Sequence, residues 1–302
     1  MSIKRTLIES GKWYKGNTHL HTTLSDGTLE PAEAVAIYRN AGYSFTAVTD
    51  HWYYGNHRYL ESDGFLVFAG MEMDTKFPRD HRKGFCHHVV VIADPEKTPY
   101  QTGDRLSDVR ALGDMTAMVD HMNECGHLCI YAHPTWSHIK MEEYDKINGC
   151  IGLEVYNHVC EIEAGCGYSD AYYNRGLWED RFQLCFASDD AHGAEHFLGG
   201  FIGVKATSLT YSDILEAIRA GSFYASTGPE IRDFYVQDGQ AYFECSPCSD
   251  ICFYTDATPG AYIVRNQPGT THATYTLPKD ASGVYAICRE GEGRAWTQII
   301  RL

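Results

Sequence analysis

The stretch His19-Leu20-His21-Thr22-Thr23-Leu24-Ser25-Asp26-Gly27 begins where a predicted strand over residues 13–18 ends. Residues i and i+2 of an extended segment point to the same side, so both imidazoles can reach one ion. Ser25-Asp26-Gly27 predicts a turn directly afterwards. Two histidines alone can equally be solvated loop residues, so a metal site requires the same pattern elsewhere in the chain.

Imidazole and carboxylate side chains recur beside the later predicted strands. The segments concerned are Thr49-Asp50-His51 after strand 45–48, Gly70-Met71-Glu72 after strand 65–69, Ala132-His133-Pro134 after strand 128–131 and Asp189-Asp190-Ala191-His192 after residues 184–188, while His87-His88 opens strand 89–93. Such side chains at consecutive strand ends build a multi-ion site at the rim of a barrel. Neighbouring strand residues face opposite sides, so only one of His87 and His88 is expected to bind. The recurrence predicts a metal site.

The chain divides into two regions of different texture. Up to about residue 222, short β-branched runs alternate with helix-length segments, including one capped by Thr28 with Pro31 in its first turn. Alternating strands and helices predict a parallel sheet, either open or closed into a barrel. After Thr227-Gly228-Pro229 only short strand-like runs follow, separated by Gly, Pro and Asp. We therefore expect an α/β domain over residues 1–228 and a small all-β appendage over residues 229–302.

The composition excludes several classes of function. The 302 residues carry a formal net charge of −15, which argues against a long nucleic-acid partner, because that binding needs clustered Lys and Arg. The first residues lack the apolar core of a secretory signal, and no apolar run is long enough to span a membrane. The count of eleven cysteines is odd, and most lie in apolar strand contexts, which favours reduced, buried thiols in a cytoplasmic protein.

The blocks quoted above resemble the PHP (polymerase and histidinol phosphatase) family, in family order and at plausible spacing over roughly residues 13–225. The tail, including Gly221-Ser222-Phe223-Tyr224-Ala225-Ser226-Thr227-Gly228-Pro229 and residues 289–302, is similar to a branch of carbaryl-hydrolase-like metallohydrolases that append a small β domain. The resemblance implies a distorted (β/α)7 barrel that holds three divalent ions (Mn, Zn or Fe) at the carboxyl ends of its strands.

Carried onto the matching positions, the resemblance also implies a set of ligands. The first ion would be held by His19, His21, Glu72 and Asp190, the second by Glu72, His133 and His88, and the third by Asp26, His51 and His192. His88 is favoured over His87 because it directly abuts the apolar strand. Asp50 and Asp189 are then expected to orient imidazole N–H groups.

The charges of such a cluster predict its chemistry. Three divalent ions exceed the charge of the ligand carboxylates Glu72, Asp26 and Asp190, and a hydroxide and an anionic phosphate can neutralise the surplus. Metal binding lowers the pKa of water to about 7, so metal-bound hydroxide can act as the nucleophile and no Ser or Cys is required. We therefore expect a phosphoesterase acting on a small phosphorylated metabolite, such as a nucleotide or a sugar phosphate, with Glu72 and Asp190 as catalytic ligands.

Further residues and rival functions stay open at this point. His158 follows another predicted strand and is a candidate general acid or substrate contact, as opposed to a rim histidine without a role. Arg58 and Arg175 are candidates for binding phosphate by bidentate hydrogen bonds, although Arg is usually a solvated surface residue. The same cluster would serve a carbamate, ester or amide hydrolase, and a non-catalytic metal- or glycan-binding protein is the alternative from another class. The oligomeric state is not predicted.

Overall fold

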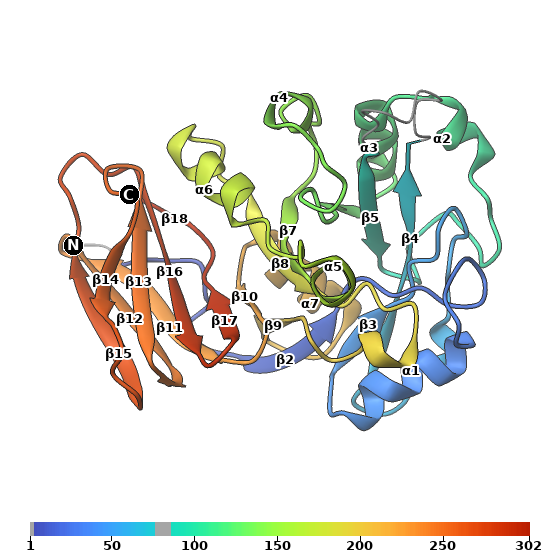
Figure 1. Cartoon of the computed structure of the whole chain (residues 1–302). Helices are drawn as coiled ribbons and strands as arrows, with labels where there is room; N and C mark the ends of the chain where they lie inside the picture. The colour runs from blue at the N-terminus through green and yellow to red at the C-terminus, as the bar shows by residue number, and fades with distance from the viewer. Residues whose placement is uncertain (1–2, 76–85) are drawn as a thin grey trace.

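The computed structural model describes residues 3–75 and 86–302, which form a mixed α/β protein with a large central sheet (Figure 1). Its helices are α1 (Pro31–Asn40), η1 (Arg58–Leu60), α2 (Ser107–Ala111), α3 (Met115–Glu124), α4 (Met141–Tyr144), α5 (His158–Ala164), α6 (Asp170–Trp178), η2 (Ala194–His196) and α7 (Tyr211–Arg219). The predicted helices near residues 31, 114–126 and 212–220 are thus present, whereas α5 and α6 were not predicted.

The part of the sheet that carries the predicted site residues follows the order β9-β2-β3-β4-β5-β6-β7-β8. These strands are β2 (Lys12–Asn17), β3 (Phe45–Ala47), β4 (Leu66–Asp74), β5 (His88–Ala93), β6 (Leu128–Tyr131), β7 (Gly152–Asn157), β8 (Leu184–Ser188) and β9 (Phe201–Ala206). Most are buried on both faces, as expected for strands covered on each side.

The direction of β5 decides which residues share one edge of the sheet. β2, β3 and β4 are parallel, β5 is antiparallel to both β4 and β6, and β6, β7 and β8 are again parallel. The first residue of β5 therefore lies at the same edge as the carboxyl ends of its neighbours. This direction explains why His88 opens its strand although the other candidate residues stand at or beyond strand ends.

The described strands do not show a (β/α)7 barrel. β4 and β5 pair directly as antiparallel neighbours, which need no crossover helix, and β2 continues through the antiparallel β9 into β10 (Phe223–Ser226). The ends of β2 and β8 are linked by a single parallel bridge between Leu20 and Ala191. The hydrogen-bonded path is therefore an extended, sheet-rich arrangement in which the carboxyl ends of β2 and β8 meet.

Local chemistry explains where the helices begin. Asp114 caps α3 by accepting a hydrogen bond from the Ala117 backbone N–H, and Thr210 caps α7 in the same way through Asp213. The expectation that Thr28 caps α1 is wrong, because Glu30 occupies the cap and its N–H bonds to Glu33 Oε2 at 3.1 Å.

The C-terminal strands complete two sheets. β11 (Ile231–Gln237), β12 (Gln240–Cys248) and β15 (Thr270–Thr276) form a four-stranded sheet with β1 (Lys4–Arg5), whereas β13 (Asp250–Thr255), β14 (Ala261–Val264), β16 (Gly283–Glu290), β17 (Gly293–Trp296) and β18 (Ile300–Arg301) extend the central sheet. All of residues 229–302 are described, and they contain no helix. β17 pairs with β10, so the central sheet runs without interruption across the predicted boundary at residue 228 (Figure 1).

Two further expectations can be compared with the described residues. All eleven cysteines lie in this part of the chain and are free thiols. Within residues 3–75 and 86–302, no helix combines the length and the apolar character that a membrane crossing requires.

Candidate metal centre

The strand ends described above surround one cavity of about 270 Å³. Its lining residues are Asp26, His51, Glu72, His88, His133, Trp136, Val159, Cys160, Glu163, Asp190 and His192. His19 and His21 follow β2, His51 follows β3, Glu72 lies in β4, His88 opens β5, His133 follows β6, and Asp190 and His192 follow β8. The structure therefore brings together all nine side chains that the sequence suggested as ligands.

The buried carboxylate of Glu72 lies at the centre of this set. Its Oε2 is 3.3 Å from His19 Nε2, 3.2 Å from His21 Nε2 and 3.3 Å from His51 Nε2, and its Oε1 is 2.8 Å from His88 Nδ1 and 3.3 Å from His133 Nε2. One carboxylate thus faces five imidazoles that come from four different segments of the chain. A carboxylate whose two oxygens each lie beside imidazole nitrogens is suited to bridging two ions.

The described His, Asp and Glu side chains form three groups whose ligand atoms lie within 4.8 Å of one another. They are His19, His21, Glu72 and Asp190; His21, Asp26, His51 and His192; and His51, Glu72 and His88. The first group has the same members as the ligand set implied for the first ion. The second adds His21 to the set implied for the third ion, and the last contains His51 where His133 was expected.

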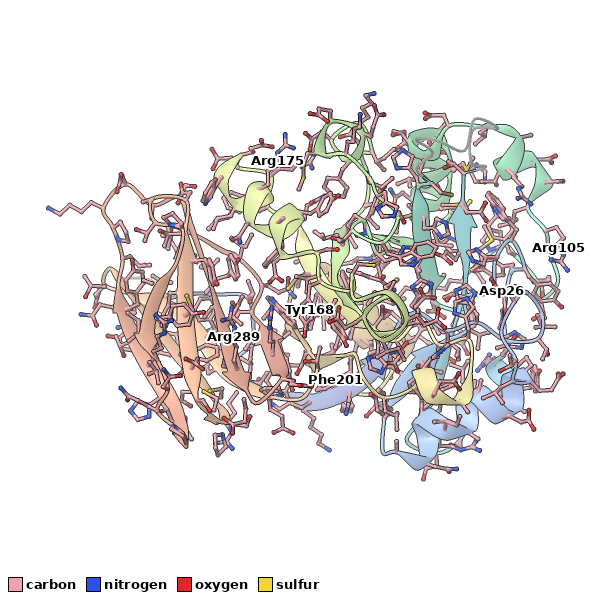
Figure 2. The ribbon with its side chains drawn as sticks, viewed as in Figure 1. Asp26, Arg105, Tyr168, Arg175, Phe201 and Arg289 are labelled. Carbon is pink, nitrogen blue, oxygen red and sulfur yellow. The ribbon has the colours of Figure 1, made fainter. Side chains whose placement is uncertain are left out.

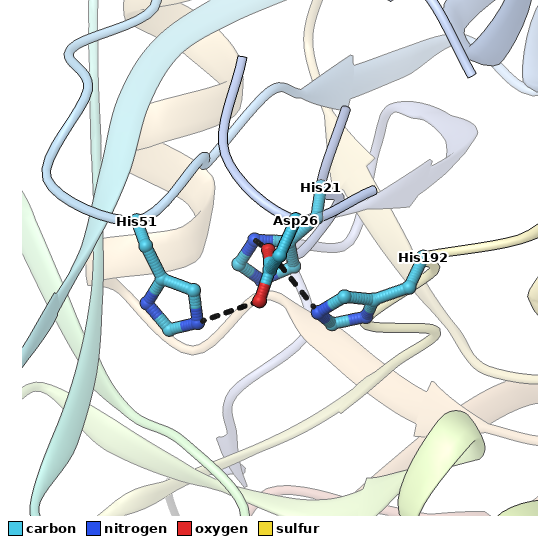
Figure 3. Close-up of side chains that lie close together, drawn as sticks. All are labelled: His21, Asp26, His51 and His192. Carbon is cyan, nitrogen blue, oxygen red and sulfur yellow. Dashed lines mark ion pairs between the residues drawn. The ribbon is translucent and has the colours of Figure 1, made fainter. Parts of the chain in front are cut away.

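Figure 3 shows the group around Asp26, in which only His21 is fully buried. Asp26 Oδ1 is 3.4 Å from His21 Nδ1 and 3.5 Å from His192 Nε2, while Asp26 Oδ2 is 3.7 Å from His51 Nε2. About half of the Asp26 side chain is exposed, in contrast to the buried Glu72 and Asp190. Water and a substrate can therefore reach this group most easily.

His87 and His88 face opposite sides of β5, as their neighbouring positions predict. His88 Nδ1 points to Glu72, whereas His87 Nδ1 lies 2.5 Å from the Tyr131 hydroxyl. Of this pair, only His88 lines the cavity and belongs to a group.

The set of candidate ligands fits divalent cations because its side chains present more lone pairs than protons to the centre of the group. His19 Nδ1 lies 2.8 Å from Glu154 Oε1, and a proton on Nδ1 leaves a lone pair on Nε2 of the neutral ring. That Nε2 faces His21 Nε2 at 3.0 Å and Asp190 Oδ1 at 3.1 Å. Asp190 Oδ1 is itself buried without a hydrogen-bond partner among the described residues. Nitrogen and carboxylate ligands in this combination suit Mn, Fe and Zn.

The pKa shifts of Glu72 and His19 also indicate that positive charge stabilises this cluster of carboxylates. Burial opposes ionisation of Glu72, but the imidazoles of His51, His19 and His88 hold its pKa well below the usual value. Burial likewise opposes protonation of His19, yet Asp190, Glu72 and Glu154 raise its pKa to about 10. Either protons or metal ions must balance these carboxylates, and bound divalent ions would replace the protons.

Two of the candidate ligands have strained backbones. Asp190 has φ 53° and His133 has φ 28°, in the left-handed region that residues other than glycine rarely occupy. Hydrogen bonds from Asp190 N to His19 O at 3.1 Å and from His133 N to Glu154 Oε2 at 3.0 Å help to hold these conformations. Such strain is often stored at functional sites.

Glu154 in β7 was missed as a site residue. Its buried carboxylate accepts hydrogen bonds from His19 Nδ1, Ser188 Oγ, Asn157 Nδ2 and the His133 backbone N–H. It thereby fixes two candidate ligands from behind, as carboxylates do for metal-bound histidines. A charged residue inside the apolar run of residues 151–155 is the signal that could have identified it.

The roles expected for Asp50 and Asp189 are wrong, because neither carboxylate accepts a hydrogen bond from an imidazole of residues 3–75 or 86–302. Asp50 accepts hydrogen bonds from Thr22 and Ser25 and so fixes the turn that carries Asp26. Asp189 accepts from the Tyr38 hydroxyl and from the backbone N–H groups of residues 198–200. Each therefore fixes the loop that carries a ligand instead of the ligand itself.

The three expected substrate contacts do not line the cavity. Arg58 pairs with Glu61 and Glu96. Arg175, which lies on α6 and away from Asp26 (Figure 2), pairs with Asp145 and Glu179. The ring of His158 is directed to the Tyr156 hydroxyl at 2.8 Å, whereas its neighbours Val159 and Cys160 line the cavity. Both guanidinium groups are therefore paired with carboxylates that do not line the cavity.

No protein-family model and no curated protein matches the sequence. Among solved structures, the chain is similar to a two-domain protein from Bacteroides vulgatus that contains a predicted PHP-like metal-dependent phosphoesterase. The identity is 14%, the match covers 95% of this chain and 93% of that chain, and the TM-score is 0.50.

Two further structures match over smaller shares of the chain. An amidohydrolase from Chromobacterium violaceum shows 15% identity over 59% of this chain and 88% of its own, with a TM-score of 0.39. PsfC from Pseudomonas syringae shows 14% identity over 70% of this chain and 90% of its own, with a TM-score of 0.44. At these identities a likeness concerns the fold, and the match over nearly the whole length is the one that carries weight. The chain therefore shares its overall fold with the Bacteroides vulgatus protein.

Proposed function

We propose that this protein is a metal-dependent hydrolase of phosphate esters, acting on a small phosphorylated metabolite such as a nucleotide or a sugar phosphate. We further propose a trinuclear site loaded with Mn, Zn or Fe, in which His19, His21, Glu72 and Asp190 hold the first ion, Glu72, His88 and His133 the second, and Asp26, His51 and His192 the third. The observation that carries the proposal is the single carboxylate of Glu72 in contact with five imidazoles in one cavity.

The chain's own residues divide the work in this proposal. Divalent ions supply a Lewis acid and an acidified water when they are bound. Glu72 and Asp190 keep the ligand set anionic, and the exposed Asp26 side of the cavity admits the ester. Glu154 keeps the proton of His19 on Nδ1, so that Nε2 stays free to bind. No serine or cysteine nucleophile is needed.

The proposal also includes the barrel, the β appendage, the small substrate and the cytoplasmic location that the sequence suggested. The parallel bridge between Leu20 and Ala191 supports a distorted (β/α)7 barrel that closes between β2 and β8. Residues 229–302 contain strands and no helix, which supports a β appendage over this range. The net charge of −15 supports a small substrate instead of a long nucleic acid, and the eleven free thiols fit a cytoplasmic location.

Turnover of two chromogenic substrates tests the reaction class. The protein is loaded with Mn, Zn or Fe, and hydrolysis of p-nitrophenyl phosphate is compared with that of p-nitrophenyl acetate. We expect the phosphate to be hydrolysed with the higher kcat/KM. Preferred turnover of the acetate would favour a carbamate, ester or amide hydrolase, and no turnover of any phosphate ester in a broad panel would favour a binding protein.

Three substitutions test the ligand assignment. His19→Ala, Glu72→Ala and Asp190→Ala should each abolish phosphatase activity, because each removes a ligand of the buried group. Each should also reduce the metal content measured by elemental analysis of the purified protein. Normal metal content together with normal turnover in all three variants would refute the assignment.

A further inference from the structure

One wall of the cavity consists of residues that contact no candidate metal ligand through a charge pair. Helix α5 contributes Val159, Cys160 and Glu163, which lie at positions i, i+1 and i+4 and therefore share one face of the helix. Trp136, from the loop after β6, completes the wall. A substrate whose phosphate reaches the ligand groups can lay its organic part against these side chains.

Glu163 is held in place by His196, which follows the candidate ligand His192 in the chain. Its Oε1 lies 3.2 Å from His196 Nε2. The other ring nitrogen, His196 Nδ1, accepts hydrogen bonds from the backbone N–H groups of His192 and Gly193 at 3.2 and 3.1 Å. The proton of this ring is therefore on Nε2, the nitrogen that faces Glu163. This contact engages one carboxylate oxygen, and with 62% of the side chain exposed the carboxylate stays accessible to a ligand.

Trp136 packs against two of the candidate ligands. Its ring packs edge-to-face on His133, with ring centroids 5.1 Å apart and an interplanar angle of 84°, and on His88 at 6.1 Å and 77°. The side chain is nevertheless 39% exposed, so an apolar surface remains open toward the solvent. An indole face attracts cations as well as apolar groups.

We propose that this wall is the subsite for the alcohol part of the substrate and that it selects an alcohol carrying an ammonium group. Val159 and Trp136 would cover its carbon atoms, and Glu163 would pair with the ammonium nitrogen, while the phosphate points to the ligand groups. A carboxylate at this place repels a second anionic group and favours a phosphomonoester with a cationic arm. This inference deepens the proposed function and rests on it.

Two pairs of matched probes test the subsite. The first pair is 4-(2-aminoethyl)phenyl phosphate and 4-(2-carboxyethyl)phenyl phosphate, compared by kcat/KM on the metal-loaded protein. The second pair is the corresponding non-hydrolysable benzylphosphonates, compared by calorimetric Kd. We expect the ammonium probe of each pair to be favoured by about tenfold, as one partly exposed charge pair with a cation–π contact allows. Glu163→Gln should remove most of this preference, and Trp136→Leu should weaken binding of both members of each pair.

Matched controls separate the subsite from a general charge effect. Glu195 is 74% exposed and lies 3.6 Å from the same His196 Nε2, but it does not line the cavity, so Glu195→Gln should keep the preference. Trp178, which is 56% exposed on α6, provides Trp178→Leu as the aromatic control. An undiminished preference in Glu163→Gln, or an equal loss in Glu195→Gln, would overturn the subsite. If no phosphate ester is hydrolysed but the phosphonates still differ in Kd, the reaction class fails while the subsite stands.

Discussion

Glu154 and Glu72 are both buried carboxylates, yet their neighbours give them different tasks. The oxygens of Glu72 face ring nitrogens from five histidines, whereas those of Glu154 are occupied by four hydrogen-bond donors. Glu154 has no acceptor capacity left that a metal ion could use without losing a donor. It therefore acts through His19 and His133 and is a positioning residue.

Glu154→Gln should lower metal affinity by about 10- to 100-fold, the usual effect of removing such a support. The amide NH₂ would face at least one of the four donors, and the ring of His19 would lose a charged acceptor. A competitive chelator titration measures the affinity, and circular dichroism checks that the fold is kept. Glu142→Gln, at an exposed position on α4, is the matched control. Unchanged affinity in Glu154→Gln would contradict the positioning role.

Asp26→Asn should remove one ion from each chain and leave the others bound. Asp26 is the only carboxylate in its group, while the other two groups share Glu72. Elemental analysis should show a metal-to-protein ratio lower by about one, with kcat/KM reduced by at least about 100-fold because a ligand at the reacting centre is lost. Asp63→Asn, in an exposed turn, should change neither quantity. Loss of all metal in Asp26→Asn would show that the groups do not load separately.

At the scale of strands and helices, periodicity and turn residues were sufficient to predict most strands and the helices α1, α3 and α7. They were insufficient for α6, which contains Tyr172, Tyr173 and Gly176, all poor helix formers that are buried by tertiary packing. The antiparallel direction of β5 was also not predictable, since a strand has the same local pattern in both directions. Ligand candidates were found because they stand beside the predicted strands, whereas Glu154 lies inside the apolar run of residues 151–155.

The junction between α3 and β6 predicts a dependence of stability on pH. His127 is buried there, its Nδ1 lies 3.2 Å from Met122 O and its Nε2 lies 2.7 Å from the Tyr54 hydroxyl. Burial lowers the pKa of His127 to about 4, below the ordinary value of 6.5. The neutral ring is thus favoured by the fold, and its contribution is complete above pH 6.5 and is lost as the pH falls from 6.5 toward 4.

His127→Gln should therefore flatten the pH profile of stability. Lowering the pH from 7 to 5 should cost the native protein about 2 kcal/mol through this residue, and the variant should lack that loss. Urea denaturation of chelator-treated protein at both pH values measures the difference and keeps metal release out of the comparison. His272→Gln, at an exposed position in β15, should retain the native profile. The same pH response in His127→Gln as in the native protein would rule out this origin.

For the whole molecule, the C-terminal strands β13, β14, β16, β17 and β18 form one sheet with the strands that carry the candidate ligands. Trp296 of β17 is fully buried, its indole N–H donates to Asp170 Oδ1 of α6 at 2.8 Å, and its neighbour Thr297 accepts from the Tyr173 hydroxyl at 3.0 Å. Removal of residues 229–302 would expose the edge of β10 and the apolar surface under α6.

Trp296→Ala should destabilise the entire chain by about 3 to 5 kcal/mol, the usual cost of emptying a large aromatic site. Because the sheet is continuous, unfolding should be a single transition seen alike by far-ultraviolet circular dichroism and by release of bound metal. Trp178→Ala, at an exposed position on α6, is the control and should cost far less. Two separate transitions, with only the later strands affected by Trp296→Ala, would show that the two regions fold independently.

Three hydrogen bonds between backbone atoms join the loops after β2 and β8, from Asp190 N to His19 O, from His21 N to Ala191 O and from Thr28 N to His192 O at 3.1, 3.0 and 2.7 Å. Peptide groups form these bonds whatever side chains they carry. Natural variation or laboratory selection can therefore exchange imidazole for carboxylate on either loop, and so alter which element the cavity prefers, while the scaffold underneath keeps its shape.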